Sequence, residues 1–465
     1  MSAIAGLLCL DRQSIDADPA ERMAAALGWR GGAEDGCYRS PEGRAVLAAR
    51  PLAGTAQPLT NETHDVWLVL DGEIHNHREL RHTLTLLGHR FRSGSDVEVA
   101  LHAYEQWDLD FPTHLHGAFA LALWDDRRDR LVLARDRLGR KPLFVARHRG
   151  RLGFASGIGA LMDELDLPRR LDPVALSHYL TVGTVPAPAT LVAGISLLGG
   201  GEMLVCERGQ TPRRRRWRWL TPDGSRAAAM RPLPAERHAG NLRTLLECAV
   251  ADRLGSDGRA GVYLAPSAAS GAIAAIATRL TGTPPATVAV CDDPHGAAAA
   301  EVQRLAQAAG VQPDLIRVSA GDVAAALPAL VGRMVAPVAS PAAVPTWFAA
   351  ARSAPTRPGA LLADGGAEEL LLTRPAYAPY RCGPWRRLWQ TLLPARRRPL
   401  EQNLPPGLRL FRDDVAPLLE VAVPAAVPLG PPLPDWLAGD RLGAVGVYDL
   451  ALRVADGAAP AWDAA

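Results

Sequence analysis

The stretch Leu264–Ser270 has the small residues of a phosphate-binding loop but no acidic side chain. It follows an apolar run at 260–264 and precedes an Ala- and Ile-rich segment typical of a helix. Such a turn holds a phosphate when backbone N–H groups can approach it and a nearby carboxylate binds Mg²⁺. Pro266 removes one backbone donor, and Ala268 and Ala269 supply no carboxylate. The loop is therefore expected to bind ATP poorly.

Lysine is nearly absent from the chain, in which Lys141 is the single example and arginine is abundant. This bias, with abundant Ala, Gly and Pro, is most simply explained by a GC-rich coding sequence. Whatever its origin, it excludes lysine-dependent chemistry after residue 141.

Cysteine and histidine spacing predicts no metal site. The six cysteines are scattered, without a Cys-x-x-Cys pair, which is typical of reduced thiols in a cytoplasmic protein. Four histidines lie close together beside arginines, which indicates a solvated helix face and no metal centre. They are His75, His77, His82 and His89.

Composition argues against membrane and nucleic-acid partners. The 465 residues are 48% hydrophobic and 22% charged, with a formal net charge of +2, as in soluble globular proteins. The sequence lacks a run of membrane-spanning length and a secretory signal, so a cytoplasmic location is expected. The Arg- and Trp-containing run 213–218 and the arginines at 396–398 leave nucleic-acid binding as an alternative, which would require a steep salt dependence.

Two patterns divide the chain. Residues 1 to about 200 contain short apolar runs broken by turn residues, which predict strands, and Ser95 with Asp96 predicts a helix start. After about residue 235, strand-like and helix-like segments alternate, which predicts a parallel sheet covered by helices. The predicted strands of the first part are Ile4–Cys9, Val66–Leu70, Phe119–Trp124, Leu131–Ala134 and Leu143–Ala146.

Motifs in both parts resemble the glutamine-dependent asparagine synthetase family. Those of the first part are Ile4–Gly6, Gln57–Leu59, Gly72–Leu80, Ser95–Glu98, Gly117–Asp125 and Ala134–Leu143. Those of the second part are Leu264–Ser270 and Ala363–Glu368, at the positions of the family's pyrophosphatase-type loop and a second acidic motif.

The resemblance implies an α+β N-terminal-nucleophile sandwich, like class II glutamine amidotransferases, over 1–205. A linker over 206–235 is expected to follow. The remainder, 236–465, is expected to be an α/β parallel-sheet ATP-pyrophosphatase domain, like the adenine nucleotide α-hydrolases, degenerate and shortened with a substrate-binding segment missing. Family members use this domain to adenylate a carboxylate with ATP and then let an amine displace AMP.

Glutamine hydrolysis in this family needs an N-terminal cysteine, and the corresponding residue here is Ser2. A hydroxyl is far less nucleophilic than a thiol at neutral pH. The asparagine that stabilises the oxyanion aligns with Asp71, whose negative charge has the wrong sign for that role. We therefore expect no useful glutaminase activity and assign no catalytic residue.

The glutamine pocket survives in part. The arginine that binds the glutamine carboxylate in the family aligns with Pro51, although Arg50 is adjacent. Gly72, Glu73 and Asp96 match the pocket and are interpreted as remnants that hold loops together.

The synthetase site is similarly changed. Both Mg²⁺-binding aspartates of the family align with alanines, Ala269 and Ala367, and the late lysine that steadies phosphate is absent. ATP and Mg²⁺ are therefore not expected to bind tightly. The remnants of the nucleotide loops are Ser267, Ser270, Asp364, Gly365, Gly366 and Glu368.

These changes predict a homologue with two eroded sites, a pseudoenzyme that acts as a protein partner or scaffold, or as a homo-oligomer, in amide-forming peptide or natural-product metabolism. The alternative is an active AMP-forming synthetase of the asparagine synthetase or lactam and lasso-peptide cyclase type, which would need ATP and Mg²⁺. Cyclases of this type dispense with the glutaminase cysteine because an internal amine replaces ammonia.

Overall fold

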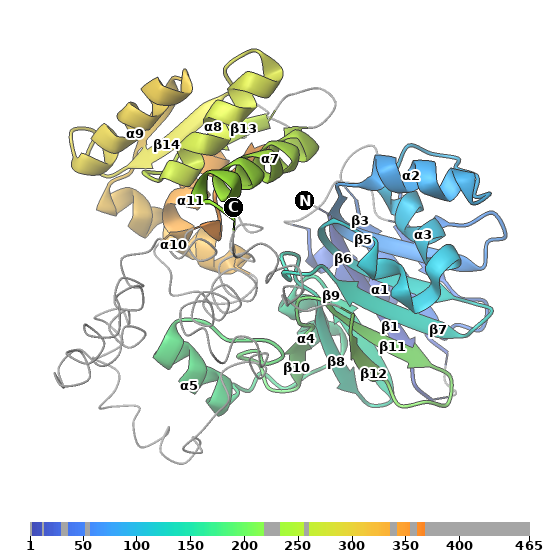
Figure 1. The fold of residues 1–465 in the computed structure, drawn as a ribbon. Coiled ribbons are helices and arrows are strands. Elements are labelled where there is room, and N and C mark those ends of the chain that lie inside the picture. The colour runs from blue at the N-terminus through green and yellow to red at the C-terminus, as the bar shows by residue number, and fades with distance from the viewer. Residues whose placement is uncertain are drawn as a thin grey trace, which may run out of the picture.

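The structure is a computed structural model that describes residues 2–11, 14–28, 36–51, 56–217, 233–254, 260–334, 342–353 and 360–367. It contains an antiparallel two-sheet unit followed by a parallel-sheet unit (Figure 1). The predicted fold class is confirmed in both parts.

Two six-stranded antiparallel sheets form the first unit. In spatial order, the first sheet contains β10 (Ile195–Leu197), β8 (Phe144–His148), β9 (Arg151–Ala155), β1 (Ala3–Cys9), β3 (Ala45–Arg50) and β2 (Gly36–Arg39). The second contains β12 (Arg213–Arg216), β11 (Glu202–Glu207), β7 (Arg130–Arg135), β6 (Gly117–Asp125), β5 (Val66–Ile74) and β4 (Leu59–Thr60). All five strands predicted from apolar runs are present.

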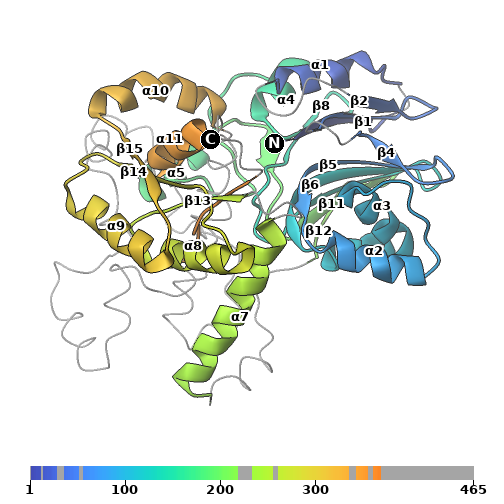
Figure 2. The same cartoon turned by 90° about the horizontal axis from the view of Figure 1, so that it is seen from above.

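Helices cover the outer faces of the two sheets (Figure 2). Helices α1 (Asp18–Ala26) and α4 (Ile158–Glu164) cover the first sheet, and α2 (His77–Leu86) and α3 (Asp96–Trp107) cover the second. The 3₁₀ helix η1 (Asp108–Thr113) follows α3, and α5 (Pro173–Val182) lies between β9 and β10 in the chain.

The layered arrangement explains why β1 is apolar at successive positions. Side chains alternate between the faces of a strand. Ala5 and Leu7 accordingly pack in the core beneath α1 and α4, whereas Ile4 and Leu8 pack in the core between the two sheets. Because both faces are covered, the strand is apolar on both sides.

Helix α3 begins as its sequence predicts. Ser95 is its N-cap, and the Ser95 hydroxyl oxygen accepts a hydrogen bond from the Val97 N–H at 3.1 Å. The cap fixes Asp96 at the first turn, beside the end of β5.

A four-stranded parallel sheet forms the second unit, in the order β15 (Pro313–Arg317), β14 (Thr287–Cys291), β13 (Ala260–Tyr263) and β16 (Ala360–Leu362). Helices α7 (Ala235–Leu254), α8 (Ala268–Thr281) and α9 (Ala297–Ala309) pack on one face. Helices α10 (Ala320–Arg333) and α11 (Ala343–Ser353) lie on the other (Figure 1).

The predicted linker 206–235 differs from the structure at its beginning. Cys206 and Glu207 end β11, and Arg213–Arg216 form the edge strand β12, so the first unit extends at least to Trp217, which is buried. Residues 218–232 of the predicted linker lie outside the described residues.

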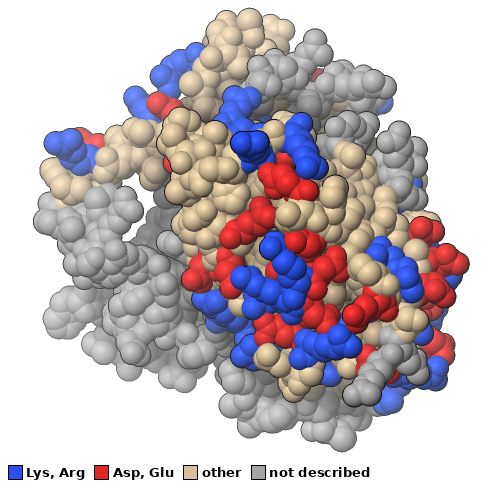
Figure 3. All heavy atoms as spheres, turned by 90° about the vertical axis from the view of Figure 1, so that its right-hand side faces the viewer, with Lys and Arg blue, Asp and Glu red and all other residues tan. Residues whose placement is uncertain are grey.

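Three of the four arginines of β12 form ion pairs with acids. Arg213 pairs with Glu207 at 3.2 Å and Arg215 with Asp110 at 2.6 Å, and Arg214 also has a glutamate partner. On the face of the molecule in Figure 3, basic and acidic side chains are interspersed and do not gather by sign. This pairing weakens the alternative of nucleic-acid binding through 213–218.

Within the described residues, none of the helices has the length and apolarity needed to cross a membrane. The five described cysteines are unpaired, and Cys9, Cys206 and Cys291 are buried.

Candidate functional site

The first candidate site lies at the beginning of β1, where the two sheets of the first unit face each other. Ser2 is buried, with 6% of its surface exposed. The Ile4 N–H donates to Ser156 Oγ at 3.1 Å, and Ser156 Oγ donates to Asp71 Oδ2 at 3.2 Å. Ser156 and Asp71 are both fully buried. At the position expected to correspond to the family's oxyanion donor, the structure therefore holds a buried carboxylate that accepts a hydrogen bond from Ser156.

Two of the three predicted pocket remnants have structural roles. Gly72 has φ +122°, and a Cβ at this position would lie 1.9 Å from the Ala118 carbonyl oxygen, so only glycine fits. Asp96 Oδ2 accepts a hydrogen bond from the Ile74 N–H at 2.8 Å and ties α3 to the end of β5. Glu73, between them, is exposed.

Arg50, which precedes Pro51, lies beside the N-terminal strand β1 in space. Arg50 ends β3 and stands opposite Ala3 in the antiparallel β1–β3 register, while Pro51 is buried directly after it. Arg50 is therefore paired with the residue that directly follows Ser2.

An arginine of the second unit interacts electrostatically with residues that follow Asp71 in the chain. Burial and the nearby Arg140 lower the pKa of Arg253, at the end of α7, while Asp252 and Glu73 oppose that shift. Burial, followed by the charges of Arg253 and Arg140, lowers the pKa of His75 to about 4. The N-terminal end of the chain lies between the two units in both views (Figures 1 and 2). Arg253 of the second unit and Arg140 of the first thus both act electrostatically on His75.

The second candidate site lies where the strand order of the parallel sheet reverses. Strands β13, β14 and β15 follow one another outward in one direction, whereas β16 adds to the other side of β13. Ligands of open α/β sheets bind beyond the carboxyl ends of the strands at such a switch point. Since Val262 pairs with Leu362, the segments after β13 and β16 meet there.

Hydrogen bonds join these two segments. Ser267 is the N-cap of α8; its Oγ accepts from the Ser270 N–H at 3.1 Å and donates to the Asp364 carboxylate. The buried Ser270 Oγ donates to the Ala265 carbonyl oxygen at 2.6 Å. The hydroxyls of Ser267 and Ser270 are therefore both engaged within the protein. Burial, and then the Asp364 charge, raises the pKa of the neighbouring Tyr263 to about 12.

The positions of the expected Mg²⁺ ligands are apolar. Ala269 lies in the first turn of α8, and Ala367 follows Gly366, which has φ +87°. In the described residues 264–270 and 363–367, Asp364 is the single carboxylate. Of the predicted remnants, Ser267, Ser270, Asp364, Gly365 and Gly366 lie together, and Glu368 lies outside the described residues.

Some residues near the sites were not identified from the sequence. Ser156 and Arg253 carry no motif and are far along the chain from the groups they approach. Asp292 and Asp293 follow β14 at the same edge of the sheet as Asp364 and are exposed. The general rule that carboxyl ends of parallel strands share an edge could have indicated the last two.

Two family descriptions match the chain. "Glutamine amidotransferase domain" matches residues 1–218, and "Asparagine synthase" matches residues 241–425.

Curated relatives agree with this assignment. Asparagine synthetase [glutamine-hydrolyzing] 3 of Bacillus subtilis is 32% identical over 50% of this chain and 38% of its own length. A putative asparagine synthetase [glutamine-hydrolyzing] of Mycobacterium bovis is 32% identical over 76% of this chain and 57% of its own length. The chain thus spans about half the length of the curated relatives it matches.

A solved structure described as the allosteric regulatory enzyme of purine biosynthesis covers 68% of this chain and 80% of its own, at 14% identity and a TM-score of 0.36. A likeness of that size carries no argument about this protein. The order of the two matched domains and the 32% identity to synthetases decide the matter, and the chain belongs to the asparagine synthetase-like family.

Proposed function

We propose that this protein is a non-catalytic member of its family that acts as a protein partner in amide-forming peptide or natural-product metabolism. The observation that carries the proposal is the hydrogen bond from Ser267 to Asp364. It engages the single carboxylate of the described switch-point loops with a loop hydroxyl.

The energetic argument rests on metal binding. Mg²⁺ in nucleotide sites is held by one or two carboxylates together with substrate phosphates. With Ala269 and Ala367 at the expected ligand positions, Asp364 would be the one carboxylate of these loops available to a metal ion, and one of its two oxygens already accepts a hydrogen bond from Ser267. Loss of one preorganised electrostatic group typically costs about 3–4 kcal/mol of barrier, although such losses are not additive.

The first site supports the same proposal. Ser2 replaces the thiol expected from the family, and a buried Asp71 carboxylate stands where an oxyanion donor is expected. Neither group favours the tetrahedral anion of amide hydrolysis.

A partner role is supported by apolar surface on α7. Leu245 is 67% exposed and Leu242 38% exposed on this 20-residue helix. Contiguous exposed apolar surface marks protein contact sites, and Leu242 and Leu245 lie one turn apart on this helix.

A second candidate is an active AMP-forming synthetase of the asparagine synthetase, lactam or lasso-peptide cyclase type. The observation in its favour is that Ser267, Asp364 and Gly366 still meet at the switch point. Such an enzyme would take ATP and Mg²⁺ as cofactors, consistent with the matched family.

One experiment distinguishes the two functions. The purified full chain is titrated calorimetrically with Mg-ATP, and AMP and pyrophosphate are measured with a panel of carboxylic acids. The partner role predicts no heat and no product. Pyrophosphate release that disappears in the Asp364→Ala variant would establish the synthetase, because a contaminating enzyme would not respond to that substitution.

A further inference from the structure

Three side chains that can bind a metal converge beside α3, on the outer face of the second sheet. His89 follows α2, and His102 and Glu105 lie one turn apart on α3. Their ligand atoms all lie within 4.8 Å of one another. Glu105 Oε2 is 2.7 Å from His102 Nδ1 and 3.7 Å from His89 Nδ1. One carboxylate oxygen therefore faces two imidazole nitrogens.

The second nitrogen of each imidazole ring faces an acceptor. His89 Nε2 lies 3.1 Å from Gln106 Oε1, and His102 Nε2 lies 3.9 Å from Glu98 Oε1. A proton on His89 Nε2 satisfies Gln106 and leaves a lone pair on His89 Nδ1. His102 Nδ1 is hydrogen-bonded to Glu105 Oε2, and transfer of the ring proton to Nε2, on the side of Glu98, frees the second Nδ1 lone pair. Metal-binding histidines usually show this arrangement, with the remote N–H directed at a carboxylate or carbonyl oxygen.

The carboxylate and one ring are also held in place by neighbours. Asn61 Nδ2 donates to Glu105 Oε1 at 2.7 Å, which leaves Oε2 directed at the histidines. The Phe91 ring meets the His102 ring edge to face, with centroids 4.8 Å apart. His102 is 1% exposed, so its orientation is fixed by packing. Two imidazole nitrogens and a carboxylate oxygen that converge in this way supply three ligand atoms of the kind that a metal ion takes.

We propose that His89, His102 and Glu105 bind one Zn²⁺ ion, with a water molecule as the fourth ligand. Zinc takes imidazole and carboxylate ligands tetrahedrally at about 2.0–2.2 Å, which places neighbouring ligand atoms roughly 3.3 Å apart. The two separations from Glu105 Oε2, 2.7 and 3.7 Å, bracket that value, and all the ligand atoms lie within 4.8 Å of one another, so binding requires side-chain rotations that bring the two imidazole nitrogens together.

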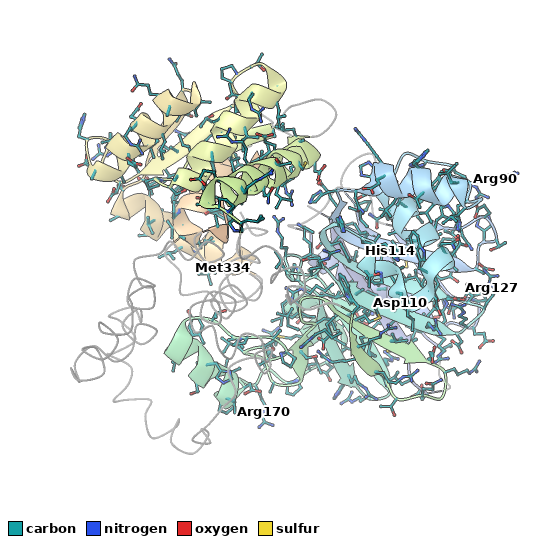
Figure 4. The ribbon with its side chains drawn as sticks, in the orientation of Figure 1. Arg90, Asp110, His114, Arg127, Arg170 and Met334 are labelled. Carbon is teal, nitrogen blue, oxygen red and sulfur yellow. The ribbon has the colours of Figure 1, made fainter. Side chains whose placement is uncertain are left out.

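The site is distinct from both candidate sites already described. Figure 4 shows Arg90, the neighbour of His89, at the outer edge of the first unit, whereas Met334 lies on the side of the second unit. The His89 and Glu105 side chains are 17% and 19% exposed, which gives solvent and a metal ion access. An ion here would join the α2–α3 connection to α3. The sequence-based interpretation of His89 as part of a solvated helix face is therefore wrong, since it lies beyond α2 and contacts α3.

The test uses the full chain, treated with EDTA, freed of chelator and titrated with ZnCl₂ by calorimetry at pH 7.5. One Zn²⁺ ion per chain and an upward shift of the melting temperature are expected. Titration with Co²⁺ should give the visible absorption of a tetrahedral ion. Failure of the folded wild-type chain to bind Zn²⁺ stoichiometrically would overturn the proposal.

Substitutions then locate the ion. His89→Ala and Glu105→Gln should each weaken Zn²⁺ binding by about 100-fold or more, the upper end of what loss of a supporting partner costs. Gln106→Ala, at an exposed position, should weaken it by roughly 10-fold without affecting folding. His82→Ala is the matched control, because His82 is an exposed histidine of α2 that is outside the cluster. Equal affinity in His89→Ala and wild type, with both folded by circular dichroism, would place the ion elsewhere and refute the assignment.

Discussion

The two units differ in how they accommodate the residues found at their candidate sites. In the first unit, the unexpected carboxylate of Asp71 is fully buried and accepts a hydrogen bond from Ser156. In the second unit, alanines occupy the positions expected to hold acids, and the remaining Asp364 is bonded to Ser267. The first site thus keeps polar groups and ties them into the core, whereas the second has fewer polar groups.

This difference predicts unequal responses to restoration. A buried, hydrogen-bonded group is costly to change, because its partner loses its bond. An alanine at a helix start can accept a longer side chain more easily. The second site should therefore regain ligand binding through simple substitutions, whereas the first should tolerate few changes.

The largest expected effect is that of Gly72→Ala. The added Cβ would lie 1.9 Å from a backbone oxygen at φ +122°, and strain together with overpacking should lower the free energy of unfolding by about 3 kcal/mol or more. The matched change in the second unit is Gly271→Ala, whose Cβ would have the flexible end of the Leu305 side chain as its nearest neighbour, at 3.0 Å. A helical position gains about 0.5–1 kcal/mol from alanine, so the net effect there should be near zero.

Urea unfolding of both variants, followed by circular dichroism, checks this contrast. Equal midpoints for Gly72→Ala and wild type would show that β5 does not need a glycine at that position.

The next effect concerns glutamine hydrolysis in the first unit. Ser2→Cys restores a thiol, but the Asp71 carboxylate should still oppose the oxyanion. Adding Asp71→Asn should raise the rate of Ser2→Cys by about 100-fold, or roughly 2.7 kcal/mol, the value of one oxyanion donor. Glutamate release by the single and double variants measures it. A double variant no faster than Ser2→Cys would contradict the role assigned to Asp71.

Much of the fold could be predicted from the sequence. Strand β1 is apolar on both faces because it lies between two cores, and a run such as Ile4–Cys9 identifies it without any long-range information. The approach of Asp364 to the 264–270 loop follows from a parallel sheet, in which carboxyl ends share an edge.

Other features depend on contacts that no local pattern encodes. Ser156 reaches Asp71 across 85 positions of the chain, from the end of a strand in the other sheet. The sequence Arg213–Arg216 looks like a solvated linker, but in the structure it is a strand. Acids on neighbouring elements pair with Arg213 and Arg215, and the sequence alone does not show these acids to be close. The histidine cluster forms because the chain turns back after α2 and brings His89 against α3.

A smaller effect is expected from restoring acids to the second unit. Ala269→Asp together with Ala367→Asp should create Mg²⁺-dependent ATP binding that wild type lacks. At ten times Kd, the ligand should stabilise the variant by about 1.4 kcal/mol, seen as a rise in melting temperature. Ala298→Asp with Ala300→Asp is the control, since it adds the same charge at exposed positions of α9. A shift equal in both double variants would mean that the switch-point loops do not hold the nucleotide.

The smallest effect tests the junction between the two units. His75 has a pKa of about 4, below its ordinary value of 6.5, because of burial and the charges of Arg253 and Arg140. Between pH 6.5 and 4 the unfolded chain therefore binds more protons, so stability is fully present above pH 6.5 and falls as the pH drops towards 4. By pH 5 this should amount to about 1 kcal/mol, since His75 is only half-buried.

Arg253→Gln sharpens this test because it removes one like charge from the second unit and leaves the first unit unchanged. The pKa of His75 should then rise and the loss of stability between pH 7 and 5 should become smaller. Nuclear magnetic resonance titration measures the pKa of the His75 ring directly. Comparison with His82→Gln identifies the signal of an exposed histidine, His82, which serves as the reference. If the pKa of His75 is the same in Arg253→Gln as in wild type, the charge of Arg253 does not act on His75 in solution. The two sites would then be electrostatically independent.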